Sequence, residues 1–147
     1  MVKIPPGGGQ PLPVPNALLL CDWVIREQGS GKNSLIGVFE NINVNREPTP
    51  ENPILHPGLT LYAKITGAEG TYHWRFELVR LRDNHTLASG DIGDITYPDR
   101  LQANEMVVGI RLVPLFELGR YEFRLYADDR LVAFKTFDVL LLKWEKS

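Results

Sequence analysis

A glycine-rich stretch followed by a lysine, Gly29-Ser30-Gly31-Lys32, is the first candidate for chemistry in this sequence. Phosphate-binding loops follow the pattern G-x-x-x-x-G-K-[ST], in which backbone amides and the lysine hold the phosphates and the hydroxyl binds a metal. Here Arg26 stands where the first glycine is needed, and Asn33 replaces the Ser or Thr. The residues that follow are typical of a strand, whereas a phosphate loop opens a helix. We therefore expect a turn with a solvated Lys32.

Two charged residues, Asp22 and Arg26, interrupt the apolar run ALLLCDWVIR at residues 17–26. A charge on an apolar face must be paired or hydrogen-bonded, because burying an isolated charge is costly. Residues four apart on a strand are separated by about 13 Å, so these two cannot easily pair with each other. We expect Asp22 to pair with Lys32 or with an arginine of another strand. A binding or catalytic carboxylate is the alternative.

Hydrolytic chemistry has little support in the sequence. There is no G-x-S-x-G elbow, and His56, His73 and His85 fall in a proline-rich loop, on the polar face of a strand and in a turn. A catalytic triad is recognised by its geometry, so distant residues can still form one. On this evidence we assign no catalytic residue.

No group of residues has the spacing of a metal site. Asp91, Asp94 and Asp99 lie close together but lack the D-x-[DN]-x-[DN]-G order of a calcium loop. No two His or Cys residues stand at the spacing of zinc ligands. We expect a solvated acidic loop here, with no metal and no cofactor.

The three tryptophans are candidates for stacking on a sugar. Trp23 and Trp74 fall on apolar faces of expected strands and are predicted to be core residues. Trp144, between Lys143 and Glu145, is the best candidate for an exposed contact residue. The alternative for Trp144 is that it caps the end of the last strand.

These candidates depend on two apolar arms that the pattern predicts as strands, residues 17–26 and 34–44, joined by the glycine-rich EQGSGKN. Within the first arm Cys21, Trp23 and Ile25 share one face, because successive side chains of a strand alternate. A free cysteine in such a strand is predicted to be a small buried hydrophobe.

The rest of the chain also has the period of two that is typical of strands. Turn residues separate the apolar segments, notably the proline-rich 45–58, RDNH at 82–85, the glycine-rich 90–104 and Asp128-Asp129. Tyr121 resembles the tyrosine corner of immunoglobulin-like sandwiches, in which a Tyr at a strand start bonds to upstream backbone. The expected strands are 59–66, 72–78, 87–92, 106–112, 121–127 and a last one after Asp129. We predict an all-β antiparallel β-sandwich of about eight strands, with immunoglobulin-like or similar Greek-key topology.

The composition fits one domain that needs no disulfide bond or structural metal for its stability. The chain has 147 residues, a single cysteine and a formal net charge of -2, so no overall charge attracts nucleic acid or an anionic membrane. Residues 1–16 hold five prolines and read as a Pro/Gly-rich arm, which leaves 17–147 for the sandwich domain. The arm lacks the apolar run of a signal peptide, and we expect a cytoplasmic location.

The stretches LLLCDWVIREQGSGKNSLIGVFENI and HPGLTLYAKITGAEGTYHWRFELV resemble a family of small, uncharacterised bacterial proteins that is catalogued only as a domain of unknown function. The resemblance spans roughly residues 17–142. It implies a compact β-rich domain in bacteria, and it brings neither an activity nor catalytic residues.

Three functions remain open at this point. The first is a non-enzymatic sandwich that binds another protein or itself through its sheet edges and the loop at Gly29 to Lys32. The second is an enzyme or small-ligand module with a site beside Asp22 and Lys32, and the third is a carbohydrate-binding module. We expect a protein partner or a homo-oligomer, and neither nucleic acid nor a membrane. The candidate binding residues are Asp22, Arg26, Gly29, Ser30, Gly31, Lys32 and Trp144.

Overall fold

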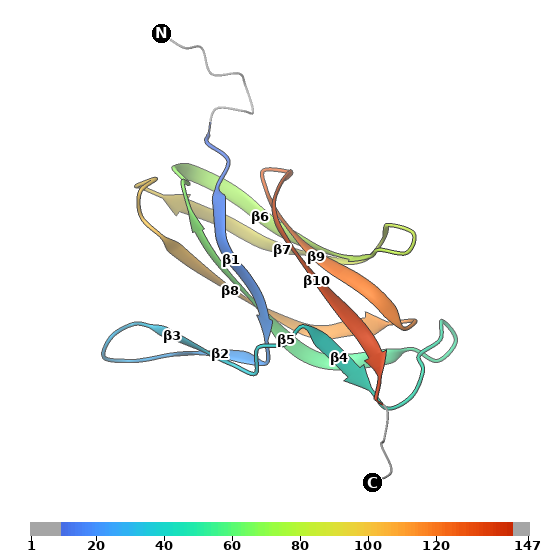
Figure 1. The fold of residues 1–147 in the computed structure, drawn as a ribbon. Coiled ribbons are helices and arrows are strands. Elements are labelled where there is room, and N and C mark those ends of the chain that lie inside the picture. The colour runs from blue at the N-terminus through green and yellow to red at the C-terminus, as the bar shows by residue number, and fades with distance from the viewer. Residues whose placement is uncertain (1–9, 143–147) are drawn as a thin grey trace.

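The computed structural model describes residues 10–142, which form ten strands and no helix (Figure 1). Eight of the strands build two sheets, with the orders β1-β5-β8 and β4-β10-β9-β6-β7, and the remaining pair, β2 and β3, forms a separate hairpin. The strands are β1 (Val14–Cys21), β2 (Trp23–Arg26), β3 (Asn33–Ile36), β4 (Asn41–Val44), β5 (Ile54–Thr66), β6 (Gly70–Arg80), β7 (His85–Tyr97), β8 (Asn104–Leu115), β9 (Gly119–Ala127) and β10 (Arg130–Leu141). No helix among the described residues is long and apolar enough to cross a bilayer.

The two sheets face each other across one apolar core, as predicted for a β-sandwich. Leu61 and Ile65 of β5 meet Trp74 of β6 and Phe123 of β9, and all four are at most 1% exposed. Non-consecutive strands are neighbours in both layers, since β5 pairs with β8 and β6 pairs with β9, which gives the Greek-key arrangement. All pairs are antiparallel except β4 and β10.

The predicted local signals of the immunoglobulin-like sandwich are present. The Tyr121 hydroxyl donates to the carbonyl oxygen of Glu117 at 2.6 Å, which is the tyrosine corner. Asp128 and Asp129, with φ of 49° and 63°, turn β9 into β10, and Asn84 with φ of 57° turns β6 into β7. Short polar side chains tolerate these left-handed angles.

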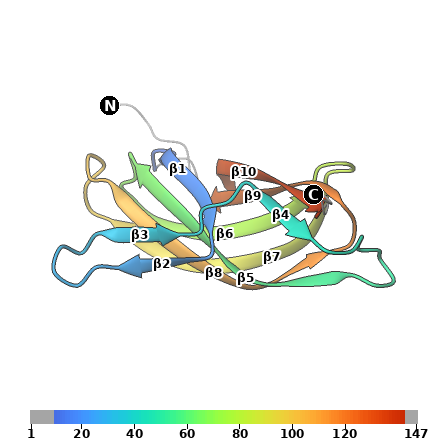
Figure 2. The ribbon, with the colours of Figure 1, turned by 60° about the horizontal axis from the view of Figure 1, so that its bottom comes forward.

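The two N-terminal arms are not single strands, which corrects the prediction. The first arm breaks at Asp22 and the second breaks between Ile36 and Asn41. The break at Asp22 is closed by a bond from its backbone N–H to the carbonyl oxygen of Ile36, at 2.9 Å, and Gly37 supplies a left-handed φ of 69°. The chain therefore leaves the sheet of β1, makes the β2–β3 hairpin and joins the other sheet as β4. The hairpin extends away from both layers (Figures 1 and 2).

Two segments expected to be loops are strands. Strand β5 begins at Ile54 and contains Pro57, which an edge tolerates, because β1 pairs with β5 only from Thr60 onward. Strand β7 continues to Tyr97 through Gly90, where an added Cβ would lie 2.3 Å from the Phe76 ring. The glycine thus allows close packing within a strand and does not mark a turn.

The end of the N-terminal arm is tied to the sandwich. Tyr72 donates its hydroxyl to the carbonyl oxygen of Pro11 at 2.6 Å, and Arg130 donates to that of Gln10 at 3.1 Å. Strand β1 starts at Val14, three residues before the predicted boundary of the arm. Residues 14–16 therefore belong to the first sheet.

Candidate functional site

The glycine-rich loop is the tip of the β2–β3 hairpin. Gly31, with φ of 70°, donates its N–H to the carbonyl oxygen of Glu27 at 2.9 Å, and Glu27 donates to that of Lys32 at 2.8 Å. These bonds close the turn that the sequence predicts. The loop connects two strands and opens no helix, so it has the backbone of a hairpin turn and not of a phosphate loop.

The hairpin has one apolar face that nothing covers within residues 10–142. Trp23 pairs with Ile36 across the strands, and Ile25 follows two residues after Trp23 on the same face. Their side chains are 55%, 37% and 49% exposed. The opposite face carries Val24 and Leu35, which are half-buried. The prediction that Trp23 is a core residue is therefore wrong, because its strand leaves the sandwich at Asp22.

Of the other two tryptophans, Trp74 and Trp144, the structure describes one. Trp74 is fully buried, as predicted. Trp144 lies outside the described residues.

Asp22 and Lys32, one of the two alternative ion pairs that we expected for Asp22, lie far apart in the structure. Asp22 lies at the root of the hairpin and Lys32 at its tip, and the backbone partner of Lys32 is Glu27. Five strand residues span about 16 Å, so no single site holds both side chains. Within residues 10–142 Asp22, Arg26 and Lys32 form no ion pair. The expected ion pair of Asp22 is absent because its side chain is exposed at the corner and needs no buried counter-charge.

A hollow lies at the root of the hairpin, between β4 and β5. Its volume is about 390 Å³, and a second hollow of about 530 Å³ adjoins it. Asn43 and His56 line both, so the two form one continuous groove along β4. The first hollow is lined by Asp22, Gly37, Val38, Phe39, Asn41, Ile42, Asn43 and His56. The second extends past Arg46 and Ile54 to Leu142.

His56 is a half-buried polar residue of this groove. Burial lowers its pKa, while the charge of Asp22 acts in the opposite direction. Its Nδ1 atom is buried and has no hydrogen-bond partner among the described residues. The sequence placed His56 in a loop, whereas it lies in β5, and the chain brings Asp22 and Asn43 beside it as it passes from β1 to β4.

A second group of polar residues lies on the outer face of the larger sheet. His73 of β6 hydrogen-bonds Asp94 through Nδ1 at 2.6 Å and Asp91 through Nε2. These bonds, that of Asp94 first, raise the pKa of His73. The two carboxylates belong to β7 and not to the solvated loop that we expected. Over residues 10–142 no cluster of His, Cys, Asp or Glu has the arrangement of a metal site.

The fold is similar to part of a solved structure. The alkylpurine DNA glycosylase AlkC of Pseudomonas fluorescens, solved with DNA containing an abasic site analog, matches 88% of this chain at 6% identity with a TM-score of 0.53. This chain spans 30% of the length of that glycosylase. An immunoglobulin-like protein of Pseudomonas aeruginosa matches 86% of this chain and 95% of its own at 15% identity, with a TM-score of 0.42.

The sequence comparisons give a family. No curated protein matches the sequence. A family model, described as a family of unknown function (DUF6941), matches residues 16–140, from the third residue of β1 to the last residue but one of β10. This match agrees with the resemblance seen in the two N-terminal stretches, and the chain belongs to the family of unknown function DUF6941.

Proposed function

We propose that this protein is a non-enzymatic interaction module that binds a protein partner through the apolar face of the β2–β3 hairpin. The exposed side chains of Trp23, Ile25 and Ile36 carry this proposal. A two-stranded hairpin alone is only marginally stable in water, so an apolar face directed away from its own core gains stability when a partner covers it. Tryptophan is also one of the residue types enriched at the energetic centres of interfaces.

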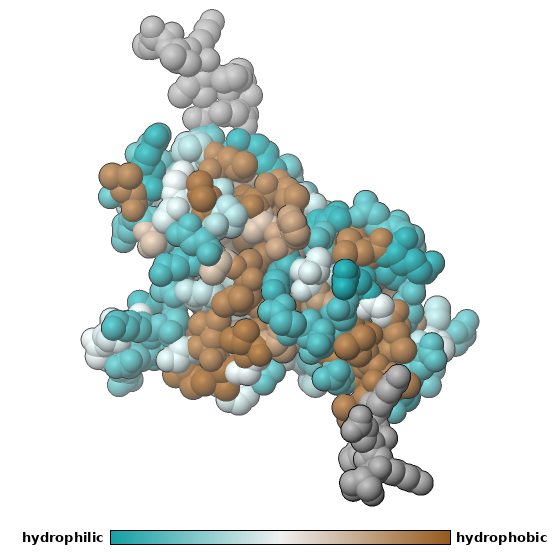
Figure 3. Space-filling model, viewed as in Figure 1, coloured by the Kyte–Doolittle hydropathy of each residue, from teal (hydrophilic) through white to brown (hydrophobic). Residues whose placement is uncertain are grey.

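The surroundings of the hairpin fit this role. Figure 3 shows hydrophobic residues concentrated along the middle of the face that carries β1, β4 and β10, down to the root of the hairpin, while the hairpin tip is hydrophilic. Val38, directly after the hairpin, is 50% exposed and extends the apolar surface. An apolar centre beside a polar border is the usual composition of a protein interface.

Site-specific crosslinking in the native host tests the proposal. A photoreactive phenylalanine analogue placed at Ile25 or Ile36 is expected to capture one discrete partner, or a second copy of this chain. The matched control places the analogue at Leu101, which is 85% exposed in a loop between β7 and β8. Equal capture from Leu101, or no capture from either hairpin position, would contradict the proposal.

A further inference from the structure

Strand β4 has one paired and one free edge. The Asp138 N–H bonds the carbonyl oxygen of Glu40 at 3.2 Å, and the Leu142 N–H bonds that of Val44 at 2.7 Å. Backbone groups alternate along a strand, so Glu40, Ile42 and Val44 direct theirs toward β10. Asn41 and Asn43 therefore direct their N–H and C=O groups away from β10. Within residues 10–142 these two residues have no backbone pairing on that side.

The free edge of β4 forms one wall of the groove described above. The opposite wall is the first part of β5, residues 54–58, and it too lacks a neighbour on the groove side, because β1 reaches only to Thr60. Figure 2 shows β4 beside the beginning of β5, with the hairpin at the far end. The groove therefore runs along unpaired backbone, the feature that accepts an added strand.

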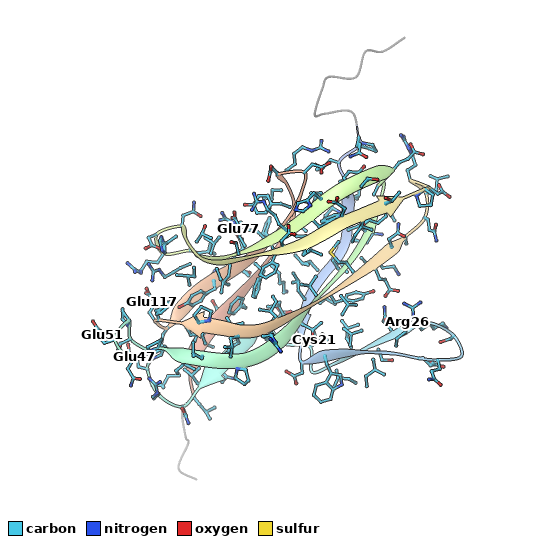
Figure 4. All side chains as sticks on the ribbon, turned by 180° about the vertical axis from the view of Figure 1, so that it is seen from behind. Cys21, Arg26, Glu47, Glu51, Glu77 and Glu117 are labelled. Atoms are coloured by element: carbon cyan, nitrogen blue, oxygen red, sulfur yellow. The ribbon has the colours of Figure 1, made fainter. Side chains whose placement is uncertain are left out.

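The groove together with the loop after β4 carries more negative than positive charge. Asp22 lines one end of the groove. Glu47 and Glu51 belong to the loop after β4, whose residues Asn45, Arg46 and Pro53 line the other end, and Figure 4 shows the two glutamates far from Arg26. None of these three carboxylates has an ion-pair partner within residues 10–142.

The two basic groups nearby, Arg46 and Lys135, leave the region with a net negative charge, although Arg46 binds only neutral carbonyl oxygens and keeps its own positive charge. The guanidinium of Arg46, which lines the second hollow, donates to the carbonyl oxygens of Asn52 and Pro53 at 2.8 and 3.0 Å. Lys135 pairs with Glu40 at 2.6 Å. The unpartnered Nδ1 of His56 adds a buried position for a hydrogen bond between the two ends.

From this geometry we propose that the groove binds an extended basic segment of a partner protein, which adds to the free edge of β4 as a further strand. The N–H and C=O groups of Asn41 and Asn43 supply the main-chain bonds, and Lys or Arg side chains of the segment meet Asp22 and the acidic loop. This site is separate from the apolar hairpin face, so either site can fail while the other holds.

A second copy of this chain is a poor occupant of the same edge. Pairing β4 with β4 of another molecule would bring Asp22, Glu47 and Glu51 of both copies to one interface. Like charges that face each other across a strand pair are destabilising. A basic partner removes this repulsion, and opposite charge also speeds the encounter.

Amide NMR of the full chain, titrated with two capped peptides of alternating sequence, KVKVKV and EVEVEV, tests the proposal. Both peptides have the same strand propensity on their valine side and differ only in charge. We expect KVKVKV to shift the amide signals of Asn41, Asn43 and residues 54–56, more weakly at high salt, and EVEVEV to leave them unchanged. Equal binding of both peptides, shifts elsewhere, or no binding at millimolar peptide would overturn the proposal.

Two variants with a matched control sharpen the test. Asn43→Pro removes an outward N–H and leaves the bonds to β10 in place, so we expect at least about tenfold weaker KVKVKV binding with a preserved amide spectrum. Asp22→Asn is expected to weaken KVKVKV binding and to reduce the salt dependence of that binding. If the proline variant does not fold, Asp22→Asn alone tests the proposal. Glu27→Gln removes one exposed charge at the hairpin tip and is the control. Equal losses in Asp22→Asn and Glu27→Gln, or dilution-dependent shifts at β4 without peptide, would refute strand addition by a basic segment.

Discussion

The hydroxyl of Tyr121 bonds the carbonyl oxygen of Glu117, four residues earlier, inside a fully buried aromatic cluster. The Tyr121 ring stacks on Phe137 with centroids 5.6 Å apart, so the bond fixes both the start of β9 and the ring. Tyr121→Phe keeps the ring and leaves a partly buried carbonyl without its donor. We expect the free energy of unfolding to fall by about 1–3 kcal/mol, measured by urea denaturation. Tyr126→Phe, whose hydroxyl bonds Glu77 at 3.2 Å in a less buried place, is the control and should cost less.

Gly90 of β7 packs closely against the ring of Phe76 on β6. A Cβ at this position would lie 2.3 Å from Cε1 of Phe76. Gly90→Ala should therefore force the ring to move and cost about 1–3 kcal/mol of stability. Gly109→Ala is the matched control, because an added Cβ there meets nothing within 4 Å. Equal stability of the two variants in urea denaturation would contradict the close packing.

His73 should make the protein more stable on the acidic side of its titration. Its pKa is raised by the hydrogen bonds to Asp94 and Asp91, so the folded state holds the proton more tightly than the unfolded state. The resulting stabilisation is complete below the unfolded pKa of about 6.5 and is lost as pH rises through the folded pKa. In Asp94→Asn the His73 pKa, followed by NMR of the ring protons, should move back toward its ordinary value. An unchanged pKa would show that Asp94 does not hold the proton.

His56 should have the opposite effect on stability. Burial lowers its pKa, so the unfolded state binds the proton more tightly, and stability falls as pH drops below about 6.5. Because His73 and His56 titrate in neighbouring pH ranges with opposite signs, the wild-type profile contains both. Comparing the pH dependence of urea denaturation in His56→Gln and His73→Gln separates them. The profiles should change in opposite directions relative to the wild type.

Trp23 and Trp74 should respond differently to substitution and to quenching. Trp23→Ser removes a side chain that lies outside the core, and we expect a change in stability within about 0.5 kcal/mol. Trp74→Ala empties a fully buried site and should cost about 3–5 kcal/mol. Acrylamide should quench the Trp23 fluorescence in the free protein. A partner or second copy bound at the hairpin should protect it.

The sequence was sufficient for the fold because the alternation of Tyr72, Trp74 and Leu78 with polar residues reports a strand with one buried face, and these residues are buried. The same pattern gave a wrong prediction for Trp23, which we expected in the core. An apolar run does not reveal that the backbone leaves the sandwich at Asp22. For a similar reason, the sequence does not show whether a glycine or a proline marks a loop or lies within a strand. Gly90 and Pro57 suggested loops, whereas cross-strand neighbours that are distant in the chain accommodate both within strands.

The candidate sites depended more strongly on topology. His73 meets Asp91 and Asp94 only through the register of β6 with β7, and His56 meets Asp22 only because the chain changes sheets between β1 and β4. No spacing in the sequence encodes either approach. The turn at Gly31, by contrast, is a local structure, and its residues were enough to predict it.

The bond between the Asp22 N–H and the Ile36 carbonyl oxygen brings the two ends of the hairpin together at one point of the sandwich. A segment that enters and leaves at one point is a replaceable appendage, whose length and sequence can change without moving β1 or β4. A variant of this chain with a different hairpin should therefore keep the same sandwich. The same junction offers a natural position for grafting a foreign binding hairpin onto this scaffold.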